Sequence, residues 1–411
     1  MATTLRSQAF FCGNLQNGID ESKIDTSVWE TIIEDRHTYD FLCSYFHKSH
    51  VDAMIQAQGQ IRPGFLDDVR HYRTKIGKTL PLSVFNENSG ELKVIDAYSL
   101  GMSYLHIYMF PLGITLYAIE IDDSGSELND LTFAHSVIRE LPSRWNQFNV
   151  EFTEALEPLL NLIPEGSLAA TRGNKLKLFQ ILLVDQNDWT DSHLYEIGCC
   201  MPVDIVESDH HLAPSKQYYD SIMAENCVAP FKTWKSLSLT DTYTALFKSA
   251  NVMDEALWEE EKQKWTGSYY RFIFLRVLVQ KTFLSTHNVQ YRQNVLNANI
   301  VRDMARMEQY YFYDNISYNF LPDLINKQME KGMAINDEKA ELSRQIKERD
   351  NKNYNTLTGI LSVFAIFSIC LDIYNLISML SGTRSRAFLS VISIISVLCI
   401  IVIVIRLIRR R

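Results

Sequence analysis

The chain of 411 residues has few of the features that mark secreted or nucleic-acid-coating proteins. Its 7 cysteines show neither metal-ligand spacing nor the density of a disulfide scaffold, which indicates a reducing compartment. Its 40 basic residues are fewer than its 49 acidic ones, so we expect no direct binding of nucleic acid. No repeat or low-complexity linker is present. The start, MATTLRSQAFFCGNLQNG, lacks a basic stretch followed by an apolar one, so no signal peptide is predicted.

Two long apolar runs close the sequence. The first spans residues 357–380 and contains a single carboxylate, Asp372, and the second spans 387–405 without any charge. A bilayer core requires about 20 apolar residues of helix, which each run nearly supplies. The connector 381–386 allows only a tight turn, so we predict a hairpin of two transmembrane helices. The alternative is a buried hairpin in a soluble core, where two runs of this length rarely occur together.

The distribution of positive charge predicts how this hairpin is oriented. The tail 406–411 is basic, and further lysines and arginines lie at 347–352, just before the first run. The connector has only Arg384 and Arg386. Because positive residues remain on the cytoplasmic side, we expect a multi-pass protein of the inner (cytoplasmic) membrane with both termini in the cytoplasm.

From Asn351 through the first run, polar and small residues recur at steps of three and four, the spacing of one face of an α-helix. An ionisable group inside a membrane usually faces a bundle interior or a water-filled path. One hairpin has too little interior for this, so we expect several copies to surround a pore. The alternative is a polar contact between helices without conduction. The predicted pore-lining positions are Asn351, Asn355, Thr358, Leu361 (or its neighbour Ser362), Ala365, Ser368, Asp372 and Asn375.

The rest of the chain predicts an α/β cytoplasmic domain followed by a stalk. Alternating apolar and aromatic residues predict strands at 92–100, 103–110, 114–121 and 176–185, with Pro111 to Gly113 turning one hairpin. Helical patterns cover 129–141, 147–162, 215–225 and about 254–318. One continuous stalk helix is expected from Pro322 to Leu380, with two helices broken at Gly332 as the alternative. The expected fold is therefore an α/β domain, a long stalk helix and a two-helix transmembrane hairpin.

This layout resembles that of the CorA-type divalent-cation channel superfamily, and local sequence agrees with the resemblance. Asn351, Leu357-Thr358, Phe364 and Ile373-Tyr374 stand in the register of the family's pore helix. The resemblance is specific over roughly the last 90 residues and one of layout elsewhere. It implies a homo-oligomer, a pentamer, with an α/β cytoplasmic domain and a divalent cation among its ligands.

The chain departs from the family at the outer end of the pore. Asn375-Leu376-Ile377 replaces the Gly-Met-Asn signature associated with selecting hydrated magnesium, and the outer turn is basic. These departures imply altered ion selectivity. A divergent subset of CorA-like proteins accompanies type III CRISPR systems as membrane effectors, and this chain resembles that subset. The resemblance implies an antiviral role and a small nucleotide messenger, such as adenylated S-adenosylmethionine.

Two sets of residues are candidates for binding sites. The stretch 71–80 contains Gly77-Lys78-Thr79, but Tyr72 occupies the position where a phosphate loop needs glycine, so it is not a Walker motif. Its basic residues are more often a solvated face than a phosphate site. The candidate ligand-binding residues are Arg70, Arg73, Lys75, Lys78, Arg172 and Lys175. The candidate metal ligands are Asp372, Glu207, Asp209 and His210, although a solvated loop is the expected state of 207–214.

The sequence thus predicts a membrane ion channel gated through its cytoplasmic domain, and no catalysis, because no nucleophile is paired with a base at recognisable spacing. The alternatives are a divalent-cation (magnesium) transporter and a non-conducting membrane-anchored sensor or scaffold. The expected segments are a cytoplasmic α/β domain at 1–253, a helical region and stalk at 254–356, transmembrane helices at 357–380 and 387–405, and a tail at 406–411.

Overall fold

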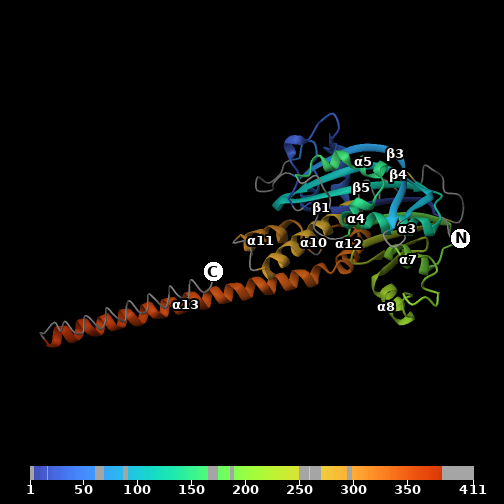
Figure 1. The fold of residues 1–411 in the computed structure, drawn as a ribbon. Helices are drawn as coiled ribbons and strands as arrows, with labels where there is room; N and C mark the ends of the chain where they lie inside the picture. Colours follow the sequence, from blue (N-terminus) through green and yellow to red (C-terminus); the bar gives the residue numbers. More distant parts are fainter. Residues whose placement is uncertain are drawn as a thin grey trace. The chain divides into compact units, whose positions relative to one another are not determined.

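The structure is a computed structural model that divides into two compact units, Met1–Lys339 and Ala340–Arg411. The residues that it describes are 4–15, 17–60, 69–86, 91–164, 175–185, 189–249, 259, 270–293, 299–313 and 315–381. The second apolar run, 387–405, the connector after Ser381 and the basic tail lie outside the described residues. The first unit combines one mixed β-sheet with helices, which confirms the α/β character expected for this part (Figure 1).

The described strands form a single nine-stranded sheet in the order β2-β3-β4-β5-β1-β6-β9-β8-β7. All neighbours are antiparallel except β6 and β9, which pair in parallel. Strand β1, from the start of the chain, lies between β5 and β6 near the middle of the sheet. The strands are β1 (Thr4–Leu15), β2 (Glu30–Thr31), β3 (Arg70–Asn86), β4 (Glu91–Phe110), β5 (Ile114–Ser124), β6 (Lys177–Asp185), β7 (Cys227–Phe231), β8 (Trp234–Ser238) and β9 (Thr242–Ser249).

Helices pack on both faces of this sheet, as Figure 1 shows. The described helices of the whole chain are α1 (Arg36–Tyr45), α2 (Lys48–Met54), α3 (Leu128–Arg139), α4 (Leu141–Arg144), α5 (Val150–Ala155), α6 (Glu157–Leu160), α7 (Asp191–Cys199), α8 (Lys216–Asn226), α10 (Tyr270–Arg292), α11 (Ile300–Tyr310), α12 (Phe320–Gly332) and α13 (Ile335–Ser381). Short 3-10 turns occur at η1 (Glu21–Lys23), η2 (Pro111–Gly113) and η3 (Trp145–Gln147).

The two faces follow from the alternation of side chains along the central strands. On one face, Ala9 and Phe11 of β1 join an apolar core with residues of α3, α5 and α7. On the other face, the Phe179 ring of β6 lies 5.3 Å from the Phe274 ring of α10. Because both faces are covered, β6 is apolar almost throughout, and its prediction as a central strand is confirmed.

The basic stretch 71–80 lies within strand β3. Gly77 has a φ of 56° and lies where the β3–β4 register shifts between Lys75 and Lys78, so it serves a β-bulge and not a phosphate loop. Pro81 lies at a second register shift, where a strand tolerates the missing N–H. Two predicted strands, 92–100 and 103–110, are in fact one, β4. The hairpin turn at Pro111 to Gly113 is confirmed.

Two helical predictions were too long. The pattern at 254–318 gives two separate described helices, α10 and α11, and the pattern at 147–162 gives the short α5 and α6 after η3. The single stalk helix expected from Pro322 to Leu380 is wrong, because α12 ends at Gly332 and α13 starts at Ile335. Periodicity continues across such breaks, so it does not locate them.

The break between α12 and α13 has a local cause. A Cβ on Gly332 would lie 2.4 Å from the Ser238 Oγ and 2.8 Å from the Ser238 backbone, so only glycine permits this approach of α12 to β8. Two residues later, Ala334 has a φ of 55°, the left-handed conformation that ends helices. The alternative of two helices broken at Gly332 is therefore the one that the structure contains.

Helix α13 contains the one apolar stretch among the described residues that is long enough to cross a membrane. Thr358–Leu376 has 19 residues and a mean hydropathy of 1.8, and none of it is buried within the chain. At 1.5 Å per residue it is roughly 28 Å long, close to the thickness of a hydrocarbon core of about 30 Å.

Candidate functional site

A cleft of about 830 Å³ lies between α10 and one edge of the sheet. Because β1 is antiparallel to β5 and β6, its carboxyl end lies beside their amino ends, and β9, parallel to β6, begins at the same edge. The sheet side of the cleft is lined by Cys12, Gly13, Asn14, Leu116, Lys175, Lys177 and Asp241. The helix side is lined by Leu278, Lys281, Thr282, Ser285, Val289 and Gln293, whose spacing of mostly three and four places them on one face.

The lysines of this cleft each contact a carboxylate. Lys177 forms an ion pair with Asp241, and Lys175 lies 3.3 Å from Glu140. Lys281 donates to Glu338 at 2.6 Å. The cleft therefore presents three cations beside apolar side chains, with their charges partly balanced from within the protein.

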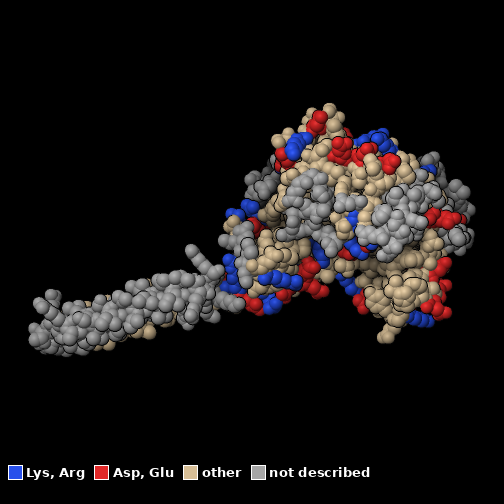
Figure 2. Space-filling view, viewed as in Figure 1, with Lys and Arg blue, Asp and Glu red and all other residues tan. Residues whose placement is uncertain are grey.

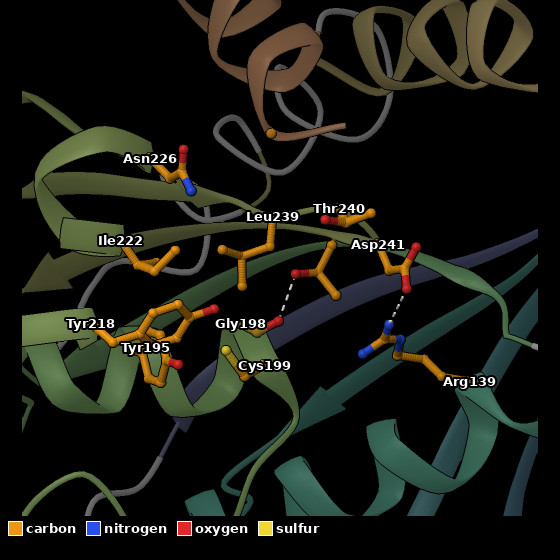
Figure 3. Close-up of a pocket in the computed structure, with 12 residues that line it drawn as sticks. Arg139, Tyr195, Gly198, Cys199, Tyr218, Ile222, Asn226, Leu239, Thr240 and Asp241 are labelled. Atoms are coloured by element: carbon orange, nitrogen blue, oxygen red, sulfur yellow. Dashed lines mark hydrogen bonds and ion pairs between the residues drawn. The ribbon is translucent and has the colours of Figure 1, made fainter. Parts of the chain in front are cut away.

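Asp241 lines both this cleft and a second pocket of about 280 Å³. Figure 3 shows the second pocket. In Figure 3 Arg139 points toward Asp241, and their ion pair measures 3.4 Å. Burial would raise the pKa of Asp241, but Lys177 and Arg139 outweigh it and hold that pKa below its usual range. The carboxylate is therefore charged at neutral pH and fixes the two cations in place.

The second pocket is lined by hydroxyl groups and a thiol from α7, α8 and the segment before β9. In Figure 3 Tyr195 and Tyr218 lie together on one side, and Thr242 donates to the Gly198 carbonyl at 2.5 Å. Burial raises the pKa of Cys199 to about 12, and it raises the pKa of Cys12 in the cleft to about 12 as well. Both thiols are therefore protonated at neutral pH and poor nucleophiles, so neither hollow contains an activated cysteine among the residues described.

A chain of polar groups, buried except for the half-buried His71, crosses β3, β4, β5 and β1 on the face that carries α10. Glu120 accepts from Gln8 at 2.7 Å and lies 2.8 Å from the Nε2 of His106. The Nδ1 of His106 is 3.0 Å from the Nε2 of His71. The His71 ring stacks on Tyr108 with centroids 4.3 Å apart.

The charges of this chain follow from its surroundings. Burial would raise the pKa of Glu120, but its hydrogen bond with His106 lowers it, so the group is a carboxylate and can only accept. Burial lowers the pKa of His106, which is therefore neutral at pH 7. Its Nε2 must then donate to Glu120, and its Nδ1 accepts from His71. The three groups form one hydrogen-bonded chain that joins β3, β4 and β5.

Because several histidines are neutral in the folded chain, we predict that its free energy of unfolding falls in mild acid. Burial lowers the pKa of His50, His71, His106 and His135, the last to about 3. The unfolded chain, whose histidines titrate near 6.5, then binds more protons, so the free energy of unfolding decreases as pH falls below about 6.5, by up to roughly 1.4 kcal/mol per pH unit for each histidine. Thermal midpoints of the full chain in detergent at pH 7.5, 6.5 and 5.5 should decline, and less steeply for His135→Leu. A flat profile in the wild type would contradict these assignments.

The basic residues singled out from the sequence do not gather around the cleft as a group. Arg70 pairs with Glu21, and Arg73 pairs with Glu30 at 2.8 Å while stacking over Tyr104. Lys75 and Lys78 lie with them on β3. Of the six candidates only Lys175 lines the cleft, and Arg172 lies outside the described residues.

The proposed metal ligands are exposed in the structure. Glu207, Asp209 and His210 lie in the segment between α7 and α8, and His210 stacks on His211 with centroids 4.4 Å apart. Among the described residues no group of three or more His, Cys, Asp or Glu side chains is placed to hold a metal ion.

The predicted pore positions all lie on α13. Asn351, Thr358, Leu361, Ala365, Ser368, Asp372 and Asn375 are exposed in the single chain, and Asn355 belongs to the same helix. The Ser362 hydroxyl donates to the Thr358 carbonyl at 2.8 Å, so it is satisfied within the helix.

Sequence reasoning missed most of the cleft. Lys281 lies in the mainly apolar centre of α10, FIFLRVLVQKTF, where Arg276 is the other charged residue, and a charge in such a run could have indicated a functional position. Lys177 follows Lys175 by two residues, the spacing that places two side chains on one face of an extended segment. The sequence around Asp241 did not indicate its role, because its ion-pair partners Lys177 and Arg139 come from distant parts of the chain.

Comparison of the chain with protein-family models, with curated proteins and with solved structures finds no match in any of the three.

Proposed function

We propose that this chain is a membrane ion channel whose α/β unit responds to a small ligand. The observation that carries the proposal is the chemistry of α13. Its segment Thr358–Leu376 is apolar, has the length of a bilayer span and is not buried within the chain, yet it contains Asp372. Among the described residues nothing covers this apolar surface or the carboxylate.

The free-energy cost of exposing the Asp372 carboxylate to lipid favours an oligomer that surrounds a water-filled path. An Asp that faces lipid costs roughly 2.5–3.5 kcal/mol at the centre of a membrane helix, and this is an upper bound for Asp372, which lies in the last third of Thr358–Leu376. The positions at steps of three and four from Asp372 are Ser368, Ala365, Leu361 and Thr358, so one stripe of the helix is less apolar than the rest. Several copies that turn this stripe toward a common axis would hydrate the carboxylates and leave the other faces to lipid.

The proposed assembly is a homo-oligomer in the cytoplasmic membrane, with the apolar run 387–405 as the second span and both termini in the cytoplasm. The resemblance to CorA-type channels supports a pentamer and a path for cations, and the missing Gly-Met-Asn supports altered selectivity. The proposed biological role is that of an antiviral membrane effector of a type III CRISPR system, answering a small nucleotide. No catalytic activity is proposed.

The experiment is ion flux from sealed liposomes containing the purified full-length chain, with and without candidate nucleotides such as adenylated S-adenosylmethionine. We expect flux above that of protein-free liposomes, changed by the activating ligand. Flux no greater than that of protein-free liposomes under every condition would favour the non-conducting scaffold. Rescue of a host deficient in magnesium uptake would favour the transporter.

A further inference from the structure

Lys281 lies between the cleft and the start of helix α13. Its side chain lines the 830 Å³ cleft. The same ammonium group donates to the Met333 carbonyl at 2.8 Å and to Glu338 at 2.6 Å. Its side chain is only 15% exposed, so these charge-assisted hydrogen bonds are poorly screened by solvent.

The two acceptors lie on either side of the break between α12 and α13. Met333 follows the last residue of α12, where carbonyls have no helical partner and the helix dipole favours a cation. Glu338 is in the first turn of α13. Between them Ala334 holds a left-handed backbone conformation that alanine disfavours. A single lysine thus clamps a strained junction from both sides.

The lining of the cleft defines what could compete for this lysine. Lys175, Lys177 and Lys281 supply positive charge, which the Asp241 carboxylate in the same lining balances in part. Leu116, Leu278 and Val289 supply apolar surface. A volume of about 830 Å³ suits a small organic molecule. An occupant with an apolar body and an anionic group, phosphate or carboxylate, would satisfy both kinds of lining.

We propose that the cleft binds a small organic anion, and that its charged group draws Lys281 away from Glu338 and the Met333 carbonyl, which releases the first turn of α13. Binding of the anion and release of the first turn of α13 are coupled, because the Lys281 ammonium group cannot bind the anion and still hold Glu338 and the Met333 carbonyl at full strength. Helix α13 is continuous from Ile335 to Ser381, so a change at its first turn affects the helix that contains Asp372. Only this last step rests on the proposed channel function.

The test is hydrogen exchange of the full-length chain in detergent, read on peptides that cover residues 333–345. Glu338→Gln weakens the contact with Lys281 and keeps the shape of the side chain. The matched control is Asp337→Asn, one residue earlier, which removes the same charge from an exposed side chain. We expect exchange roughly tenfold faster in Glu338→Gln than in Asp337→Asn, equivalent to about 1.4 kcal/mol.

The ligand arm uses phenyl phosphate and benzoate as organic anions, with inorganic phosphate at equal ionic strength to correct for screening. Either organic anion should accelerate exchange at the junction in the wild type and have no effect on Lys281→Met, whose junction is already released. Equal exchange in Glu338→Gln and Asp337→Asn would overturn the proposal, as would a wild type insensitive to both anions. Because hydrogen exchange needs no membrane flux, a failed flux assay would leave the Lys281 result intact. Equally, unchanged exchange at the junction would leave the flux result intact.

Discussion

Arg276→Met is expected to destabilise the α/β unit by about 3–5 kcal/mol, the cost of leaving a buried carboxylate without its partner. The Arg276 side chain is fully buried and donates to Asn326 at 2.6 Å and to Glu330 at 2.8 Å. It also donates to the carbonyls of Tyr311 and Tyr313, so it joins α10 to α12 and to the segment after α11. Since domains are stable by only about 5–15 kcal/mol, the loss should be large in an unfolding experiment on the full chain in detergent.

Two further variants distinguish the loss of stability caused by an unpaired buried charge from that caused by any substitution of an arginine. Arg302→Met removes an arginine whose side chain is 62% exposed and whose ion pair with Asp303 is long, 3.7 Å, and it should cost less than about 1 kcal/mol. The double variant Arg276→Met/Glu330→Met removes both buried charges and should recover part of the loss. A double variant less stable than Arg276→Met alone would show that the loss arises elsewhere.

Asp372→Asn is expected to reduce cation flux through liposomes by roughly tenfold, because a ring of carboxylates concentrates cations at a narrow path. The amide keeps the size and hydrogen-bonding capacity of the side chain and removes only its charge. If Asp372 instead makes a polar contact between helices in a sealed assembly, the substitution leaves flux at the background level of the wild type.

The matched control for this variant is Ile366→Ala, on the same helix but on another face. Its side chain is apolar and exposed in the single chain, as expected for a position that faces lipid. We expect its flux to stay within about twofold of the wild type, since no charge near the path changes. An equal loss in both variants would indicate that the helix assembly is damaged and would not support a role for the carboxylate.

Part of this molecule follows from local sequence. The strands at 114–121 and 176–185 and helices α3 and α8 lie where periodicity predicts them, because their patterns are set by the surface that each element buries. Strand β1 was missed, although it is central to the sheet. Its partners β5 and β6 lie more than a hundred residues away, so nothing local distinguishes its sequence from that of an ordinary apolar segment.

The cleft, too, could not be predicted from local sequence, because its residues come from many separate segments. It combines the end of β1, the beginnings of β5, β6 and β9, and one face of α10, and no short stretch of sequence contains more than a few of its residues. The break at Gly332 depends likewise on a tertiary contact, with Ser238 of β8. Figure 2 shows acidic and basic side chains interspersed over the visible described surface of the α/β unit, so overall charge also gave no indication of where a ligand would bind.

We expect the stripe of α13 that contains Thr358, Leu361, Ala365, Ser368 and Asp372 to face water within an assembly, and cysteine accessibility in sealed liposomes measures this. Ser368→Cys and Ile366→Cys, each in a chain with Cys370 and Cys399 changed to alanine, differ by two residues, about 3 Å in depth and about 200° around the helix. Labelling of the peptide by a membrane-impermeant thiol reagent is read by mass spectrometry. We predict that Ser368→Cys is labelled at least about tenfold faster than Ile366→Cys, since thiolates form in water and not in lipid. Equal labelling, or faster labelling of Ile366→Cys, would contradict it.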